Sequence, residues 1–158
     1  MRRKTRDYEA LRKALTGRKI IEWDENYIIL DNGMRLVVEM TGSDCCAWAY
    51  GEFANVVLDA AITHVSDIKY TSWEDGDTYG CSAEVTIMHN RNRICQIIGN
   101  ADAGNGGYYY SIASFIVHPP EGQPWQTDFV GSDDKGDEEE PIQVSFDYRP
   151  GFSEVLEI

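Results

Sequence analysis

The alternation of apolar and polar residues that begins at Lys19 is the strongest constraint on how this chain can fold. Residues 19–40, KIIEWDENYIILDNGMRLVVEM, are rich in Ile, Val, Trp and Tyr, and the DNG of residues 31–33 suits a tight turn with positive φ. This segment predicts a β-hairpin preceded by one more short strand. Further strands are expected at about 45–50, 62–73, 80–89, 92–101 and 107–117, divided by the turn-type clusters EDGDTYG, NRNR and ADAGNGG.

Two segments depart from this alternation and are expected to be helical. In TRDYEALRKALTG, residues 5–17, the apolar Tyr8, Leu11 and Leu15 recur at spacings of three and four, and the final glycine suits the end of a helix. Residues 53–61, FANVVLDAA, fit one or two helical turns better than a strand. We therefore expect the α+β class, with an N-terminal helix packed on a curved, mainly antiparallel β-sheet. A barrel-like body with one helix is the variant of this fold.

The composition changes near residue 120, which sets the expected domain boundary. Residues 1–120 are expected to form a single α+β domain, long enough to bury a core. Residues 121–158 form an acidic C-terminal extension with eleven Asp or Glu and two Lys or Arg. Within it, residues 131–140, GSDDKGDEEE, lack apolar side chains and are expected to be mobile. Residues 142–152 alternate again and suit an edge strand or a segment folded onto a neighbour.

The formal charge of −13 is divided unevenly along the chain. Residues 1–20 hold eight Lys or Arg and two Asp or Glu, a net of +6, which leaves −19 for the rest. An acidic body repels phosphate backbones, so direct nucleic-acid binding is not expected. No apolar stretch is long enough to span a membrane and the start lacks the features of a secretion signal, so we expect a cytoplasmic protein with no membrane partner. Its four cysteines are then expected to stay reduced.

Cys45 and Cys46, in TGSDCCAWAY at residues 41–50, are the candidates for metal or thiol chemistry. Adjacent side chains on an extended strand point to opposite faces, so the two thiols could share one metal only if the backbone turned there. Zinc ligands usually occur in pairs two to four residues apart, a spacing that this chain lacks. A site assembled from separate strands stays open, for instance from Cys81, His89 or Cys95.

A catalytic cysteine would also need a neighbouring base and a lowered pKa, and nothing in the sequence places a histidine beside either thiol. We therefore predict no catalytic residue, no metal ligand and no cofactor. Instead, the segment is interpreted as the entry to a strand. Asp44 is expected to accept a hydrogen bond from nearby backbone at a turn, and one of the two thiols is expected to face the core.

Aromatic residues near loops suggest a recognition surface. Residues 100–110, NADAGNGGYYY, lack the Lys-Ser/Thr pair and the following helix of a phosphate-binding loop, so they are interpreted as a long hairpin loop. Exposed aromatics beside Gly and Asn are typical of protein-binding surfaces. Trp48 also lies near a strand end. The predicted protein-binding surface consists of Asn105, Tyr108, Tyr109, Tyr110, Trp73 and Trp125.

Three stretches taken together carry a resemblance: LDNG at 30–33, DCC at 44–46 and IIGNADAGNGGYYY at 97–110. Over residues 18–117 the chain resembles an uncharacterised domain family found mainly in actinobacteriophages and their hosts. In that family a hairpin with Asp-Gly or Asn-Gly leads to Asp-Cys-Cys, and Asn-Gly-Tyr-Tyr closes the domain. The resemblance implies that Asp44, Cys45 and Cys46 mark the family, that the chain is of phage origin, and that the domain is compact and β-rich. The additional Gly107, the basic N-terminal helix and the acidic extension depart from the family pattern.

The resemblance brings no activity, so several function classes remain open. The leading expectation is a non-enzymatic phage protein that binds and modulates a host protein in the host cytoplasm. The first alternative is a zinc- or thiol-dependent enzyme centred on Cys45 and Cys46. The second is an acidic nucleic-acid mimic, because rows of carboxylates can imitate phosphates. The third is a self-associating structural protein, a homo-oligomer in which the basic helix of one copy meets the acidic body of another.

Overall fold

The computed structural model describes residues 5–134, with side chains from Tyr8 onward. The part of the expected mobile run that follows residue 134, and the alternating segment 142–152, lie outside the described residues. The elements, in chain order, are α1 (Thr5–Leu15), β1 (Ile20–Asp24), β2 (Tyr27–Leu30), β3 (Arg35–Ser43), β4 (Ala49–Ala54), β5 (His64–Val65), β6 (Lys69–Asp75), β7 (Thr78–His89), β8 (Asn92–Asn105), β9 (Ser111–His118) and β10 (Trp125–Gly131).

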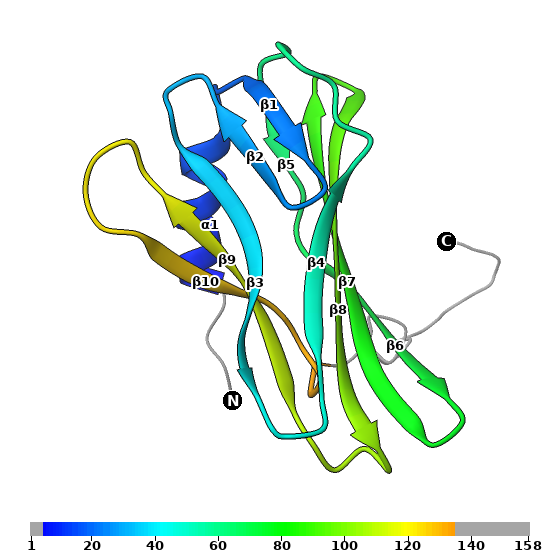
Figure 1. Ribbon diagram of the computed structural model, residues 1–158. Helices are drawn as coiled ribbons and strands as arrows, with labels where there is room; N and C mark the ends of the chain where they lie inside the picture. Colours follow the sequence, from blue (N-terminus) through cyan, green and yellow to red (C-terminus); the bar gives the residue numbers. More distant parts are fainter. Residues whose placement is uncertain (1–4, 135–158) are drawn as a thin grey trace, which may run out of the picture.

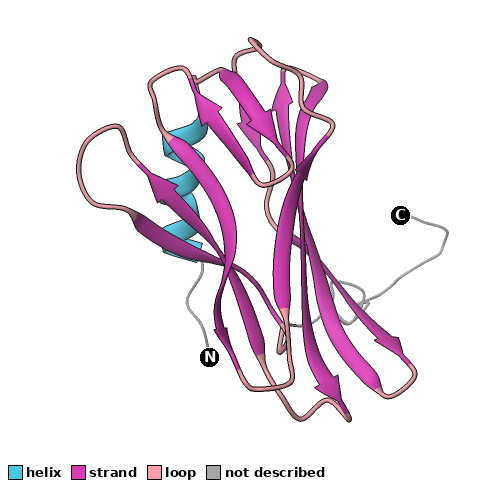
Figure 2. Ribbon diagram, in the orientation of Figure 1, coloured by secondary structure: helices cyan, strands magenta, loops and turns pink. Residues whose placement is uncertain are grey.

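The strands form two antiparallel sheets that pack face to face (Figure 1, Figure 2). The first sheet has the order β1-β2-β3-β9-β10, and the second has the order β4-β8-β7-β5, with β6 also paired to β7. Glycines let the two layers approach closely: a Cβ on Gly51 would lie 2.5 Å from Val38 Cγ1, and one on Gly99 would lie 2.4 Å from Phe129 Cε2. The core therefore sits between the sheets.

The expected α+β class is wrong, because the described part of the chain is a mainly-β fold. Its one helix, α1, touches β10 of the first sheet and β5 of the second, so it packs at the side of the two sheets and adds no helical layer. The layers are sheet on sheet, which is the arrangement that defines a sandwich. The sheets do not close into a barrel.

The helix expected at residues 53–61 is also absent. Phe53 and Ala54 are the last residues of β4, where they pair with Ile97 and Gln96 of β8. The chain then turns at Asn55, whose φ of 57° lies in the left-handed region. The following apolar residues cross the end of the sandwich as a loop in which Val57 and Leu58 are exposed, so they do not form the buried stripe that a helix would need.

The expected N-terminal helix and hairpin are confirmed. Tyr8, Leu11 and Leu15 form the buried stripe of α1, and the helix ends before Gly17, whose φ is +90°. After β1, the strands β2 and β3 pair as an antiparallel hairpin through the DNG turn, where Gly33 has a φ of +92°.

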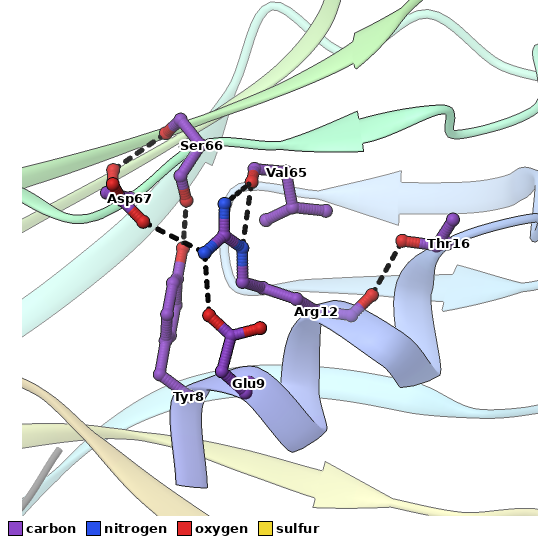
Figure 3. Close-up of polar contacts among 7 residues, drawn as sticks. All are labelled: Tyr8, Glu9, Arg12, Thr16, Val65, Ser66 and Asp67. Carbon is purple, nitrogen blue, oxygen red and sulfur yellow. Dashed lines mark hydrogen bonds and ion pairs between the residues drawn. The ribbon is translucent and has the colours of Figure 1, made fainter. Parts of the chain in front are cut away.

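Arg12 and Tyr8 attach α1 to the last residue of β5 and to the residues that follow it (Figure 3). The Arg12 guanidinium donates to the Val65 carbonyl oxygen from both Nε, at 3.0 Å, and Nη2, at 2.8 Å. Its Nη1 donates to Glu9, at 2.7 Å, and to Asp67, at 2.8 Å. The Tyr8 hydroxyl donates to the Ser66 carbonyl oxygen at 2.6 Å. These bonds give the Val65 and Ser66 carbonyl oxygens donors from the helix.

The folded unit extends past the boundary expected at residue 120. That position lies in the loop between β9 and β10, and β10 pairs with β9 from Trp125 to Gly131. Phe129 of β10 is fully buried, and its ring centroid lies 4.4 Å from that of Phe115. Beyond β10, the Asp134 carboxylate accepts a hydrogen bond from the Gly131 amide at 2.7 Å, so the chain is ordered by local contacts as far as this turn.

Candidate binding site at one end of the sandwich

Three loops meet at one end of the sandwich, at the bottom of Figure 1. They are the β3–β4 connection, the β6–β7 turn and the β8–β9 connection, and their residues 44–48, 76–79 and 104–110 are called the aromatic tip below. The Gly106 amide donates to the Asp77 carbonyl oxygen at 2.6 Å, and the Asp44 amide donates to the Tyr110 carbonyl oxygen at 2.9 Å. The aromatic tip is therefore one hydrogen-bonded surface made from segments far apart in the sequence.

Two carboxylates fix the backbone of the aromatic tip. Asp44 Oδ2 accepts a hydrogen bond from the Tyr110 amide at 3.1 Å. Asp102 Oδ1, just beneath the aromatic tip, accepts from the amides of Trp48, at 3.1 Å, and Gly104, at 3.2 Å. Backbone that is held by such bonds in the free protein loses little conformational entropy when a partner binds.

The aromatic side chains of the tip are unusually exposed for their size. Tyr108 is 86% exposed, Trp48 is 62% exposed, and Tyr110 and Tyr79 are 44% and 42% exposed. Single exposed apolar side chains are ordinary, but several large aromatics in one place are typical of interaction surfaces. The same segments contain Asp44 and Asp77 and no Lys, Arg or His. The aromatic tip thus combines aromatic rings with negative charge.

The predicted binding residues are only partly brought together. Asn105, Tyr108, Tyr109 and Tyr110 all lie in the aromatic tip. Their role in binding stays a prediction. Trp48 was noted as an aromatic near a strand end but not included in the predicted surface, and Tyr79 was not considered. The signal that could have found Tyr79 is its place two residues after the Gly76–Asp77 turn.

The other two predicted residues, Trp73 and Trp125, lie elsewhere. Trp73, on β6, covers Gly80 and donates from Nε1 to Asn100 Oδ1 at 2.8 Å, so its half-buried ring packs on its own sheet. Trp125 pairs with Val117, six residues along β9 from Ser111, which places it about 20 Å from the aromatic tip at the usual rise per strand residue.

Cys45 and Cys46 do not enter a strand, because they are the central residues of a turn from Asp44 to Ala47. The Ala47 amide donates to the Asp44 carbonyl oxygen at 3.5 Å across this turn. Both thiols are exposed, so the expectation that one faces the core is wrong. The strand alternation on which it depended starts only at Ala49. Asp44 accepts a backbone hydrogen bond as expected, but from the distant Tyr110.

The environment of the turn does not lower the pKa of Cys45, as an activated thiol would require. A hydrogen bond with Cys46 raises the pKa of Cys45, and the nearby charges of Cys46 and Asp44 act in the same direction. The charge of the Cys46 thiolate, and a hydrogen bond with it, likewise raise the pKa of Tyr109. Activated cysteines show the opposite shift. The other two cysteines, Cys81 and Cys95, are buried, and burial raises the pKa of Cys95 to about 12.

Other surfaces offer less organised chemistry. Within residues 5–134, no group of three or more His, Cys, Asp or Glu side chains is arranged to hold a metal ion. A depression of about 680 Å³ lies at the β1–β2 turn, lined by Trp23, Phe53 and the carboxylates of Asp24, Glu25 and Glu52. It contains none of the residues predicted from the sequence. No helix of the described part of the chain is long and apolar enough to cross a membrane.

A family model described as a domain of unknown function, DUF7448, matches residues 13–116. The chain belongs to this family. The expected membership in an uncharacterised domain family is thereby confirmed. The DUF7448 match begins within α1 and ends within β9, so it contains the whole aromatic tip and leaves β10 outside. No curated protein and no solved structure matches the chain.

Proposed function

We propose that this DUF7448 protein is a non-enzymatic binding protein that recognises another protein through the aromatic tip. The observation that carries the proposal is the cluster of Trp48, Tyr79, Tyr108 and Tyr110, all exposed on a backbone already held by hydrogen bonds. Tyr and Trp dominate the energetics of protein interfaces because they bury much area at low entropic cost.

The charge of the aromatic tip indicates the chemistry of the partner. Because the tip has carboxylates and no basic side chain, it suits a partner surface that presents Arg or Lys. A guanidinium stacked on Tyr108 or Trp48 would gain cation–π attraction as well as the charge of Asp77 or Asp44. A phosphate backbone would be repelled.

The resemblance to an actinobacteriophage family supports the finer form of this proposal. In that form the protein is made by a phage, acts in the cytoplasm of its bacterial host, and binds and modulates a host protein. No residue of the described chain is assigned a catalytic role in it.

The test is capture of a partner by the full chain from an actinobacterial lysate, with two matched variants. W48A/Y108A removes the two most exposed rings of the aromatic tip, whereas V57A/L58A removes two exposed apolar side chains from the loop after β4. We expect one protein to be retained by the wild type and by V57A/L58A, and the Kd of the purified pair to rise roughly thirtyfold in W48A/Y108A, which corresponds to about 2 kcal/mol.

Three results would count against the proposal. These are the absence of any retained protein at micromolar bait, retention that W48A/Y108A leaves unchanged, and binding that high salt does not weaken. Light scattering of the purified chain at low and high salt separates partner binding from self-association, because only self-association changes the mass of the protein alone.

A further inference from the structure

The turn from Asp44 to Ala47 carries chemistry that recognition by aromatic rings does not use. Cys45 and Cys46 are its central residues, both thiols are exposed, and the neighbouring Cys46 thiol is the main cause of the raised pKa of Cys45. On an extended strand these side chains would point to opposite faces. Because the backbone turns at Cys45 and Cys46, their side chains are not held on opposite faces of a strand. The two thiols can therefore act together.

The backbone on both sides of the thiols is fixed. On one side, Asp44 exchanges two hydrogen bonds with Tyr110, at 2.9 and 3.1 Å. On the other side, Trp48 and Asp102 are joined through the Trp48 carbonyl oxygen, at 2.9 Å, and through Asp102 Oδ1, at 3.1 Å. A change of state at the thiols is therefore confined to the turn itself and to the neighbouring Tyr109, whose pKa the charge of Cys46 raises.

We propose that Cys45 and Cys46 form a reversible dithiol–disulfide pair whose oxidant is a small-molecule disulfide. The thiolate of one cysteine attacks a sulfur of that disulfide, a protein–small-molecule disulfide bond forms, and one small thiolate leaves and takes up a proton. The second cysteine then attacks the protein sulfur of this mixed disulfide and expels the second small thiol. In sum, the two cysteines lose two electrons and two protons, and the small disulfide gains them as two thiols.

Two physical features make the pair reversible and selective. The Cα atoms of adjacent residues are about 3.8 Å apart, closer than the ~4.4–6.8 Å of ordinary disulfides, so the ring is strained and easily reduced. The other thiols of the chain, Cys81 and Cys95, are fully buried and cannot compete for an oxidant in the folded state. The inference concerns this thiol pair alone and does not depend on which partner the aromatic tip binds.

The test is oxidation of the reduced full chain with oxidised glutathione at mildly alkaline pH, followed by alkylation and trypsin digestion. Cleavage after Arg35 and Lys69 yields peptide 36–69, which contains Cys45 and Cys46 and no other cysteine. We expect this peptide to lose two hydrogen atoms and its ability to be alkylated, and to regain both after treatment with dithiothreitol. C45S and C46S, which change exposed positions, should each hold one glutathione adduct.

Two oxidation outcomes would overturn the proposal. One is a wild-type peptide that keeps a stable glutathione adduct. The other is a wild-type peptide that is still fully alkylated after a glutathione treatment under which C45S and C46S form adducts. In the former case the second thiol does not reach the first, and in the latter case the pair has no tendency to close.

Phenylarsine oxide gives a second readout that involves no oxidation. Its arsenic binds two neighbouring thiols with loss of one water, so the wild type should bind one equivalent. The affinity should fall roughly hundredfold in C45S or C46S, because the second bond is then no longer intramolecular. Equal affinity in wild type and variants would show that the thiols act singly, against the proposal.

Discussion

At the scale of single residues, the contacts of Arg12 are expected to contribute unequally to the stability of the protein. Its two hydrogen bonds to the Val65 carbonyl oxygen are partly buried, whereas the carboxylate of Asp67 is 87% exposed. We expect R12A to lower the free energy of unfolding by about 2 kcal/mol, because charge-assisted hydrogen bonds are lost. D67A should change it little, since exposed ion pairs contribute little. Urea denaturation measures both, and an equal loss in D67A would contradict this division.

R12K separates the shape of the guanidinium from its charge. An ammonium group cannot place two parallel donors on one carbonyl oxygen, so we expect R12K to recover only part of the stability lost in R12A. Full recovery would mean that charge alone fastens the helix.

Tyr8 makes stability depend on pH in the alkaline range. Burial raises the pKa of its hydroxyl above the usual tyrosine value, an effect that the charge of Arg12 only partly offsets. Because the pKa is higher in the folded than in the unfolded state, this stabilisation is complete below about pH 10 and is lost as pH rises further. We therefore expect the free energy of unfolding to fall more steeply for the wild type than for Y8F above that pH. Parallel curves would contradict the assignment.

At the scale of elements, the approach of the two sheets depends on glycine at specific register positions. A Cβ at Gly99 would lie 2.4 Å from the Phe129 ring, whereas one at Gly42 would lie at an ordinary 3.5 Å from Tyr110. We expect G99A to destabilise the protein by about 1–3 kcal/mol through overpacking, and the control G42A to be nearly neutral. Thermal unfolding compares the two. If overpacking against Phe129 is the cause, F129L should restore part of the stability that G99A loses. Additive effects of the two substitutions would exclude overpacking as the cause.

The same scale shows what the sequence could predict. The turn at Gly33 and the apolar stripe of α1 follow from residues a few positions apart, so the hairpin and the helix were foreseen. The pairing of β3 with β9 joins residues that lie 68 to 83 positions apart, from Ser43 with Ser111 to Arg35 with His118. The local alternation of apolar and polar residues contains no information about such distant pairs. Periodicity alone could not show that Val57 and Leu58 lie in an exposed loop, because a short apolar run suits several structures.

The sequence predicts only the part of the candidate site that depends on residues close together in the chain. The Gly-rich segment before Tyr108 predicts a loop with exposed aromatic residues, because turn-forming residues are a local signal. The convergence of that loop with Trp48 and Tyr79 depends on sheet pairing, so it appears only in the fold. The turn at Cys45 and Cys46 was missed because strand-forming residues follow it directly.

At the scale of the whole molecule, β10 decides where the folded unit ends. The DUF7448 match stops within β9, yet Phe129 and Val130 of β10 are fully buried in the shared core. Removing a buried Phe alone costs about 3–5 kcal/mol, which approaches the ~5–15 kcal/mol that stabilises a typical domain. Removing β10 would also leave the edge of β9 unpaired.

We therefore expect a chain of residues 1–120 to lose cooperative unfolding and its near-ultraviolet circular dichroism. A chain of residues 1–134, which keeps the Asp134 contact to Gly131, should retain both. Because the two chains differ only in the segment that contains β10, the comparison isolates that strand from everything that follows it. A cooperative transition in the shorter chain would mean that the DUF7448 region folds without β10, and that the first sheet tolerates the loss of this edge strand.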